Sequence, residues 1–427
     1  MILWGLLVGF FREMFGLPRT QKELSRRREE NRARVMARLD DYAFYRRLPI
    51  RRWEDIPVIA KKDYLAFFHD LNRPKLRLEQ ALDFGLRAET EGDDRRKWRG
   101  HTIGLSTGTS GRRWAFVVRD FEIGQWGGTI LAKTLGWGIF RPQRIAFVFR
   151  TNSPLYNGVN RGWLKLRFFS LHDDVEKTAR ALREFHPTVL ISVPHFLSAY
   201  LAVRPVREIS PRLVISGADV LEEREKKRLH DYFGFPVTEI YQATEGFLAL
   251  GCRAGHLHFN EADTLIEKED LGGGRFHPIV TDVRRETQAI IRYRMDDICE
   301  ELDHPCPCGA PTLALRKVEG RADQVLRFQS PNGEVAVFPD LLRDRLGRGD
   351  YFDWNYLVEQ TGPAQLRVTL DRALSANDQS RLRADLAQAF QLRGLEMIET
   401  DIRHAQEFPV MNGKRRRIVG PTLGPSL

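Results

Sequence analysis

The pattern of apolar and polar residues in the middle of the chain predicts short strands that alternate with helices. Short apolar runs are typical of buried strands, and amphipathic stretches with helical spacing indicate helices. Strands are expected at Thr188–Val193, Leu213–Ser216 and Val237–Tyr241, and helices at Pro194–Val203 and Val220–Phe233, the second ending at Gly234. This alternation predicts a parallel sheet covered by helices.

The same pattern continues on both sides of this region. Upstream it predicts strands at Trp114–Val118 and Ile145–Phe149, and a helix from a cap at Asp173 or Asp174 to about Phe185. Near the C-terminus it predicts a strand at Leu366–Leu370 and a helix from Asp378 to Leu392, with Asn377 as N-cap and Gly394 after its end. The C-terminal part is therefore expected to form a small α+β unit.

The N-terminal segment has two interpretations. Met1–Phe11 is almost wholly apolar but too short to span a bilayer, and a basic, helix-prone segment follows at Gln21–Leu39. The apolar start lacks the basic residues and the small-residue cleavage site of a secretory signal. We expect a helix packed on the following domain; the alternative is a peripheral membrane contact through residues 1–17.

Composition narrows the class of protein. A chain of 427 residues with 42% hydrophobic and 29% charged residues is expected to be globular, with two or more domains. Lys and Arg exceed Asp and Glu by 67 to 57, and the net charge of +10 suits nucleic acid, acidic membranes or anionic substrates. We expect no nucleic-acid partner, because no such binding module accompanies the charge. Four cysteines make no disulfide framework, which favours the cytoplasm.

A glycine–hydroxyl loop is the first candidate for chemistry. It consists of Ser106, Thr107, Gly108, Thr109, Ser110 and Gly111. The glycines let backbone N–H groups approach an anion and the hydroxyls add donors, which suits a phosphate; the alternative is an ordinary polar turn. The loop lacks the Lys–Ser/Thr pair of a Walker A motif and the third glycine of a dinucleotide fingerprint. Two more polar motifs, SGAD at Ser216–Asp219 and YQATEG at Tyr241–Gly246, follow predicted strands, where ligands bind in such sheets.

Six motifs together resemble those of adenylate-forming (AMP-binding) enzymes, and most of all the phenylacetate–coenzyme A ligase-like branch. They are STGTSG, SGAD, YQATEG, RYRMDD ending at Asp297, GRAD ending at Asp323, and the late GKRRR, and they cover residues from about 100 to the C-terminus. The resemblance implies an α/β fold, with a large multi-layer adenylation domain of parallel sheets and a small mobile α+β C-terminal domain. We expect an N-terminal helical segment at 1–40, a large ATP- and carboxylate-binding domain at 41–322, and a lid domain at 323–427.

The resemblance also implies roles for individual residues. Ser106, Thr107, Thr109 and Ser110 would hold the β- and γ-phosphates of ATP, Thr244 the α-phosphate, and Glu245 a Mg²⁺ ion. Gly217 and Ala218 would lie along the adenine, Tyr241 would stack on it, and Gln242 stands near the nucleotide where relatives often have glycine. Asp297, or its neighbour Asp296, would bind the ribose, with Arg321 beside ribose and phosphate. Asp323 would be the hinge, and Lys414 the catalytic lysine that the lid brings to the carboxylate.

The implied activity is ATP-dependent activation of a carboxylic acid to an acyl adenylate, with release of pyrophosphate. His195, Phe196 and Tyr200 lie where relatives place the acyl pocket, which indicates an aromatic or other acyl substrate. The acceptor is expected to be the thiol of coenzyme A. The segment Leu326–Pro339 differs from the thiol-tunnel loop of relatives, so a carrier-protein thiol, an amine or a hydroxyl stays open. The alternative function is a catalytically degenerate nucleotide-binding or membrane-associated scaffold.

A second candidate site is a zinc clasp within residues 252–308. Cys252, His258, Cys306 and Cys308 form a Cys₃His set, in which the Cys-Pro-Cys-Gly turn suits tight ligation. His256 competes with His258 as the ligand, and the alternative is a set of buried free thiols. Cys299 stands alone in a strand-like run and is expected in the core.

Overall fold

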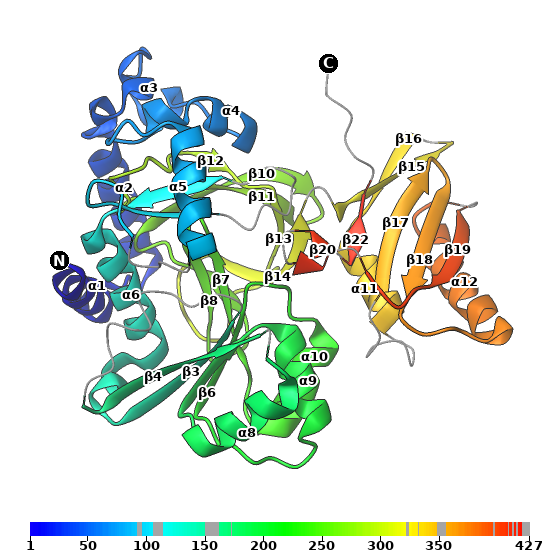
Figure 1. Cartoon of the computed structure of the whole chain (residues 1–427). Coiled ribbons are helices and arrows are strands. Elements are labelled where there is room, and N and C mark those ends of the chain that lie inside the picture. The colour runs from blue at the N-terminus through cyan, green and yellow to red at the C-terminus, as the bar shows by residue number, and fades with distance from the viewer. Residues whose placement is uncertain are drawn as a thin grey trace. The chain divides into compact units, whose positions relative to one another are not determined.

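The computed structural model describes residues 1–91, 96–105, 114–149, 162–171, 173–321, 324–331, 333–347, 356–395, 398–408, 410–411, 414–415 and 417–420. The chain folds into two compact units. The first comprises the described parts of 1–106, 114–295 and 300–317, and the second those of 296–299 and 318–427. Figure 1 shows the elements of both units.

Residues 2–233 supply most of the described helices. They are α1 (Ile2–Gly16), α2 (Gln21–Met36), α3 (Ala43–Arg46), α4 (Lys61–Ala66), α5 (Leu78–Glu91), α6 (Asp120–Leu135), α8 (Val175–Phe185), α9 (Pro194–Val203) and α10 (Glu223–Phe233). Short 3₁₀ turns connect them: η1 (Leu39–Asp41), η2 (Trp53–Asp55), η3 (Phe68–Leu71) and η4 (Gly136–Phe140).

A hairpin and one large sheet organise the strands of this part. Strands β1 (Thr102–Leu105) and β2 (Ala115–Val118) pair antiparallel. The large sheet contains β3 (Gln143–Phe149), β4 (Leu164–Ser170), β5 (Val189–Ser192), β6 (Leu213–Gly217), β7 (Thr238–Ala243), β8 (Gly246–Gly251), β9 (Leu257–Phe259), β10 (Thr264–Gly272), β11 (Arg275–Asp282), β12 (Tyr293–Arg294), β13 (Asp297–Glu301) and β14 (Ala314–Arg321). The order along its main path is β10-β11-β13-β14-β9-β8-β7-β6-β5-β3-β4.

The large sheet is parallel in one part and antiparallel in the other. Strands β4, β3, β5, β6 and β7 run parallel, and β7 then pairs antiparallel with β8. Both faces of the parallel part are buried, as its continuous apolar strands require. Helices α8, α9 and α10 cover one face, where Ala146, Leu190 and Val214 pack against Leu182, Leu197 and Leu229. On the other face Ile145, Val189 and Ile215 form a second cluster.

The predicted α/β fold class is confirmed, with differences at element ends. The predicted parallel sheet covers only part of the strands, because the chain after β7 forms antiparallel hairpins. Helix α8 has Asp174 as its cap, with the Lys177 N–H donating to its side chain. Helix α10 starts at Glu223 and not at Val220, because Glu222 and Glu225 form a capping box. Gly234 follows α10 in the left-handed region at φ 81°, as its position predicted.

The second unit contains a small sheet with helices. Its elements include β15 (Leu326–Ser330), β16 (Gly333–Val337), α11 (Pro339–Gly347), β17 (Tyr356–Gly362), β18 (Gln365–Leu370), α12 (Ala376–Gln391), β19 (Glu399–His404), β20 (Val410–Met411), β21 (Lys414–Arg415) and β22 (Ile418–Val419). In the described part, four strands pair in the order β19-β18-β17-β22. Side chains such as Val358, Val368, Leu386 and Phe390 form its core. The predicted cap Asn377 is wrong, because Ser375 accepts the Asp378 N–H and α12 starts earlier.

Helix α1 packs on α6 through glycines in both helices. A Cβ on Gly128 would lie 2.1 Å from the carbonyl oxygen of Leu6, and one on Gly9 would lie 2.2 Å from that of Gln125. Gly5 and Gly124 show the same close approach to the partner backbone. These distances leave no room for a side chain, so the glycines fix which face of α1 lies against α6. Among the described helices, none is long and apolar enough to cross a membrane.

We predict that Gly128→Ala destabilises the protein and that the neighbouring Gly127→Ala does not. A Cβ at Gly128 would collide with the backbone of α1, whereas one at Gly127 would meet nothing within 4 Å. We expect the free energy of unfolding to fall by about 2 kcal/mol for Gly128→Ala, as overpacking costs. It should rise by about 0.5 kcal/mol for Gly127→Ala, since alanine favours a helix interior. Urea unfolding measures both, and equal effects of the two changes would contradict the packing described.

Candidate functional site

The turn between β7 and β8 holds Thr244 and Glu245 where the sheet changes from parallel to antiparallel pairing. The Thr244 hydroxyl donates to Oε2 of Glu245 over 2.9 Å and accepts from Nε1 of Trp114 over 2.6 Å. Glu245 is buried, with only 8% of its surface exposed. Carboxylate oxygens are ligands that a hard divalent cation prefers. The neighbouring hydroxyl is a group that can contact a phosphate oxygen.

Trp114 is fixed on the other side by aromatic rings. It stacks on Tyr293 with 5.6 Å between ring centroids and meets the edge of Tyr64 at 5.1 Å. Trp114 directly precedes β2, so these contacts also anchor the start of that strand. The glycine–hydroxyl loop, Ser106, Thr107, Gly108, Thr109, Ser110 and Gly111, lies outside the described residues. The strand that follows the loop is therefore attached to the β7–β8 turn by Trp114.

Arg285 holds the same turn through its backbone. Its Nη1 donates to the carbonyl oxygen of Thr244 over 2.7 Å, and its Nη2 donates to Oε1 of Gln288 over 2.8 Å. Gln288 in turn accepts the Val117 N–H over 3.0 Å. These bonds connect the turn, β2 and the segment before β12 into one network of buried polar groups. Sequence motifs gave no signal for this network, because neither Arg285 nor Gln288 belongs to one of them.

The SGAD and YQATEG motifs lie on adjacent strands. Gly217 at the end of β6 is the register partner of Ile240, and a Cβ on Gly217 would lie 2.5 Å from the Ile240 side chain. Ala218 has φ 66°, a left-handed conformation that is strained for alanine. Tyr241 is half-buried and makes an edge contact with Phe259, while Gln242 is exposed. This edge of the first unit thus collects Gly217, Ala218 and the β7–β8 turn.

In the second unit, the predicted ribose residue Asp297 and Arg321 lie together. Nε of Arg321 is 3.5 Å from Oδ1 of Asp297. Asp297 is the first residue of β13 and Arg321 the last of β14. Cys299 is fully buried, as the sequence predicted, and this burial raises the pKa of its thiol well above the usual value.

The remaining predicted residues of the lid are partly outside the described chain. Asp323, the expected hinge, is one of the residues that the structure does not describe. Lys414 begins the short strand β21, which pairs with β20 in the register Met411↔Lys414. The roles assigned to Asp323 and Lys414 stay predictions.

Two of the three predicted pocket residues lie in the hydrophobic core. Phe196 and Tyr200 share the face of α9 that packs on the sheet, and both belong to its buried cluster. Burial raises the pKa of Tyr200 above its usual value. His195, at the start of the same helix, is exposed. Helical spacing explains why Phe196 and Tyr200 are buried together, because residues four apart lie on the same face of a helix.

A cavity lies beside Thr244 within the first unit. Its volume is about 610 Å³ including open solvent, and Trp126 and Phe247 line it with apolar surface. Asp263 and Arg284, which form an ion pair, give it charge. The cavity thus brings apolar and polar groups together next to the β7–β8 turn.

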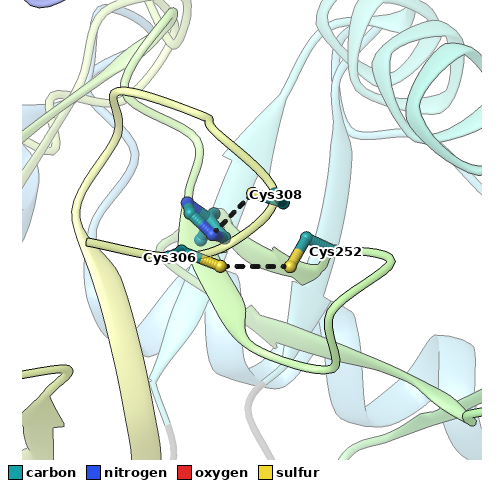
Figure 2. Close-up of side chains that lie close together, drawn as sticks. Cys252, Cys306 and Cys308 are labelled. Carbon is teal, nitrogen blue, oxygen red and sulfur yellow. Dashed lines mark hydrogen bonds between the residues drawn. The ribbon is translucent and has the colours of Figure 1, made fainter. Parts of the chain in front are cut away.

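The predicted Cys₃His set comes together in the structure. One ligand atom from each of Cys252, His258, Cys306 and Cys308 lies within 4.8 Å of the others. Sγ of Cys252 is 3.6 Å from Sγ of Cys306, and Sγ of Cys308 is 3.4 Å from Nε2 of His258. Figure 2 shows the three cysteines converging from two loops. The sulfur separation excludes a disulfide, whose bond is about 2.05 Å.

Both loops have the turns that cysteine ligands need. After Cys252, the Gly255 N–H donates to the Cys252 carbonyl and the Ala254 N–H points at its sulfur over 3.4 Å. After Cys306, Gly309 and Ala310 repeat this arrangement, with the Ala310 nitrogen 3.4 Å from Sγ of Cys308. Backbone N–H groups aimed at a sulfur favour the thiolate, which is the form that binds a metal.

The histidine of the set is oriented by the opposite ring nitrogen. Nδ1 of His258 contacts the Thr312 side-chain and backbone oxygens at 3.1 and 3.2 Å, which leaves Nε2 to face Cys308. Burial lowers the pKa of His258, and a neutral imidazole is what a metal requires. His256 is also near, with Nδ1 at 3.4 Å from Sγ of Cys306. The donor set fits a tetrahedral zinc ion.

Comparison with known proteins identifies the fold. No protein-family model and no curated protein matches the chain. Among solved structures, a 2-hydroxyisobutyryl-CoA ligase in its postadenylation state, in complex with R3-HIB-AMP, matches with a TM-score of 0.64 and 16% identity, over 94% of this chain and 90% of that one.

Two aryl-CoA ligases match over a smaller share. An anthranilate CoA ligase in complex with anthranoyl-AMP has a TM-score of 0.53 and 11% identity, over 73% of this chain and 65% of that one. A benzoate CoA ligase from Burkholderia xenovorans LB400 has a TM-score of 0.53 and 16% identity, over 71% and 65%. At these identities the likeness concerns the fold: a large mixed sheet and a small C-terminal sheet, as in adenylate-forming CoA ligases.

Proposed function

We propose that this protein is an ATP-dependent ligase that activates a carboxylic acid as an acyl adenylate. The observation that carries the proposal is the Trp114–Thr244–Glu245 arrangement at the β7–β8 turn, beside a cavity and within a fold like that of adenylate-forming CoA ligases. A buried carboxylate that accepts from a hydroxyl at a strand end is unusual for a surface turn and suits a bound cation.

Each residue has a chemical task in the proposed reaction. An oxygen of the acid attacks the α-phosphorus of ATP, a new P–O bond forms, and the bond to the bridging oxygen breaks with release of pyrophosphate. Thr244 would turn its one hydroxyl hydrogen from Glu245 to the α-phosphate. Glu245 would hold Mg²⁺, which would supply positive charge to the leaving group. Lys414 stabilises the charge that develops in the transition state. Ser106, Thr107, Thr109 and Ser110 cradle the outer phosphates, and Asp297 accepts the ribose hydroxyls.

The substrate and the acceptor follow from the same scheme. We propose an aromatic or other acyl carboxylate, bound next to the α-phosphate, where the cavity beside Thr244 offers apolar surface from Trp126 and Phe247. The solved structures that share the fold are named as ligases of 2-hydroxyisobutyrate, anthranilate and benzoate. The acceptor proposed is the thiol of coenzyme A, which attacks the acyl carbon and releases AMP; a carrier-protein thiol, an amine or a hydroxyl are the alternatives.

We predict carboxylate-dependent exchange of labelled pyrophosphate into ATP with a member of a panel of aryl and acyl acids. Glu245→Gln should lower the exchange rate by about 100-fold or more, because the amide keeps the bond to Thr244 but loses the charge that holds the cation. Glu223→Gln is the matched control, since its side chain is 81% exposed on α10.

Binding measurements separate the proposal from the alternative of a degenerate scaffold. If ATP binds but no acid supports exchange, and Glu245→Gln changes nothing, the chain is a nucleotide-binding protein without this activity. Product mass with and without coenzyme A identifies the acceptor. An unchanged unfolding temperature of Glu245→Gln would show that any lost exchange does not reflect lost folding.

We also propose that Cys252, His258, Cys306 and Cys308 hold a structural zinc ion. The convergence of their ligand atoms, the paired N–H contacts to sulfur and the orientation of His258 support it. Four protein ligands leave no open position, so the ion would have a structural role and fasten the loop after β8 to the loop before β14.

We predict that the purified protein contains one zinc ion per chain. We also predict that replacement of His258 lowers the zinc content and that replacement of His256 does not. His258→Ala should lower the zinc content at least about tenfold and reduce the unfolding temperature, because it removes a ligand. His256→Ala should retain the metal. Elemental analysis and thermal unfolding measure both effects. Four titratable thiols in a metal-free, fully stable protein would contradict the zinc site, and the reverse histidine pattern would assign the ligand to His256.

A further inference from the structure

Helix α1 presents an apolar face to solvent. The residues of this face, here named the outer face of α1, are Leu3, Trp4, Leu7, Phe11 and Phe15. They follow the helical spacing, and Trp4 and Phe15 are 62% and 74% exposed. The glycine packing against α6 makes this orientation obligatory, because only the opposite face of α1 can approach that helix. Exposed apolar surface of this kind marks an interaction site.

The outer face is also free of charge. The two charged residues of α1, Arg12 and Glu13, both turn toward the protein. Nη2 of Arg12 is 3.3 Å from Oδ1 of Asp263, and Nζ of Lys133 is 2.6 Å from Oε1 of Glu13. The usual arrangement of a surface helix, with its apolar face inside and its charged face in water, is reversed here.

Aromatic side chains of η4 extend this surface. The ring of Phe15 contacts the edge of Trp137 at 5.8 Å, and Trp137 stacks with Phe140 at 6.0 Å. Trp137 and Phe140 are 52% and 57% exposed. Through the Phe15–Trp137 contact, the outer face of α1 and the exposed rings of η4 form one patch.

Three exposed basic residues, here named the basic border, are close in sequence to the residues of the patch. Arg141 directly follows Phe140, while Arg19 and Lys22 follow the end of α1, and all three are exposed. Within the described part of the chain, none of these three has an acidic side chain within ion-pairing distance. The net charge of the whole chain, +10, has the same sign.

We propose that this patch docks on the surface of an anionic lipid bilayer, with α1 lying in the plane of the headgroups. Leu, Phe and Trp side chains favour the boundary between headgroups and acyl chains, and flanking Lys and Arg bind anionic headgroups. At 15 residues, α1 is too short to span the bilayer, which needs about 20.

A second copy of the chain fits the patch less well. A second copy carries the same positive net charge, +10, and so offers no net opposite charge to Arg19, Lys22 and Arg141. An anionic bilayer offers acyl chains to the apolar face and negatively charged headgroups to the basic border. The proposal goes beyond the proposed ligase activity and does not depend on it.

The test is flotation of the full chain with vesicles in the absence of nucleotide. One set of vesicles contains phosphatidylglycerol and phosphatidylcholine in equal amounts, and the other contains phosphatidylcholine alone. We expect the protein to float with the anionic set. The triple change Leu7→Ser, Phe11→Ser and Phe15→Ser should lower the partition coefficient at least about tenfold, because it removes the buried apolar area. The matched control is Val206→Ser with Leu392→Ser, at positions 76% and 73% exposed elsewhere on the surface.

A second variant and two controls make the outcome decisive. Lys22→Glu with Arg141→Glu should weaken binding to anionic vesicles and leave the apolar face intact. The triple variant should still unfold in one cooperative transition above the temperature of the flotation assay, since all three side chains are exposed. Absence of flotation of the wild-type protein would overturn the proposal, as would a dimer in solution that the triple change converts to a monomer. Equal binding to both sets of vesicles would overturn the role of the basic border.

Discussion

The hydrogen bond from Trp114 to Thr244 joins two regions that are 130 positions apart in the sequence. On one side it holds the strand after the glycine–hydroxyl loop, and on the other it holds the turn at which the sheet reverses its pairing. Arg285 and Gln288 complete the connection through the Thr244 carbonyl and the backbone of β2. Because the groups are buried, each must keep its partner, and together they define the position of Glu245. The cation-binding role that we propose for Glu245 would benefit from this fixed support.

Local sequence was sufficient for the parts of the fold that depend on periodicity. The strands β5, β6 and β7 and helices α8 and α9 follow from apolar runs and helical spacing, and Gly234 from its place after α10. The cap of α12 was missed, because both Ser375 and Asn377 are good N-caps and only the path of the chain selects one. Pairing across hairpins after β7 has no comparable local signal.

In the candidate sites too, some residues have a local sequence signal and others do not. The Cys₃His set could be predicted because few residue types bind zinc and two of its members stand in one short turn. Trp114, Arg285 and Gln288 could not be identified from the sequence, because their importance arises from contacts between distant segments. Phe196 and Tyr200 are assigned to a pocket by their position in the chain, and the structure shows both side chains in a buried cluster. Their role in a pocket stays a prediction.

The glycine contact between α1 and α6 has a consequence for how the N-terminal helix can vary. Each added residue rotates the following part of an α-helix by about 100°. A one-residue insertion between Gly9 and Phe11 would leave the glycines seated while turning Phe15 toward the side of the helix. The direction in which each side chain points around the helix axis, and not only the number of apolar residues, therefore limits the insertions that this helix can accept.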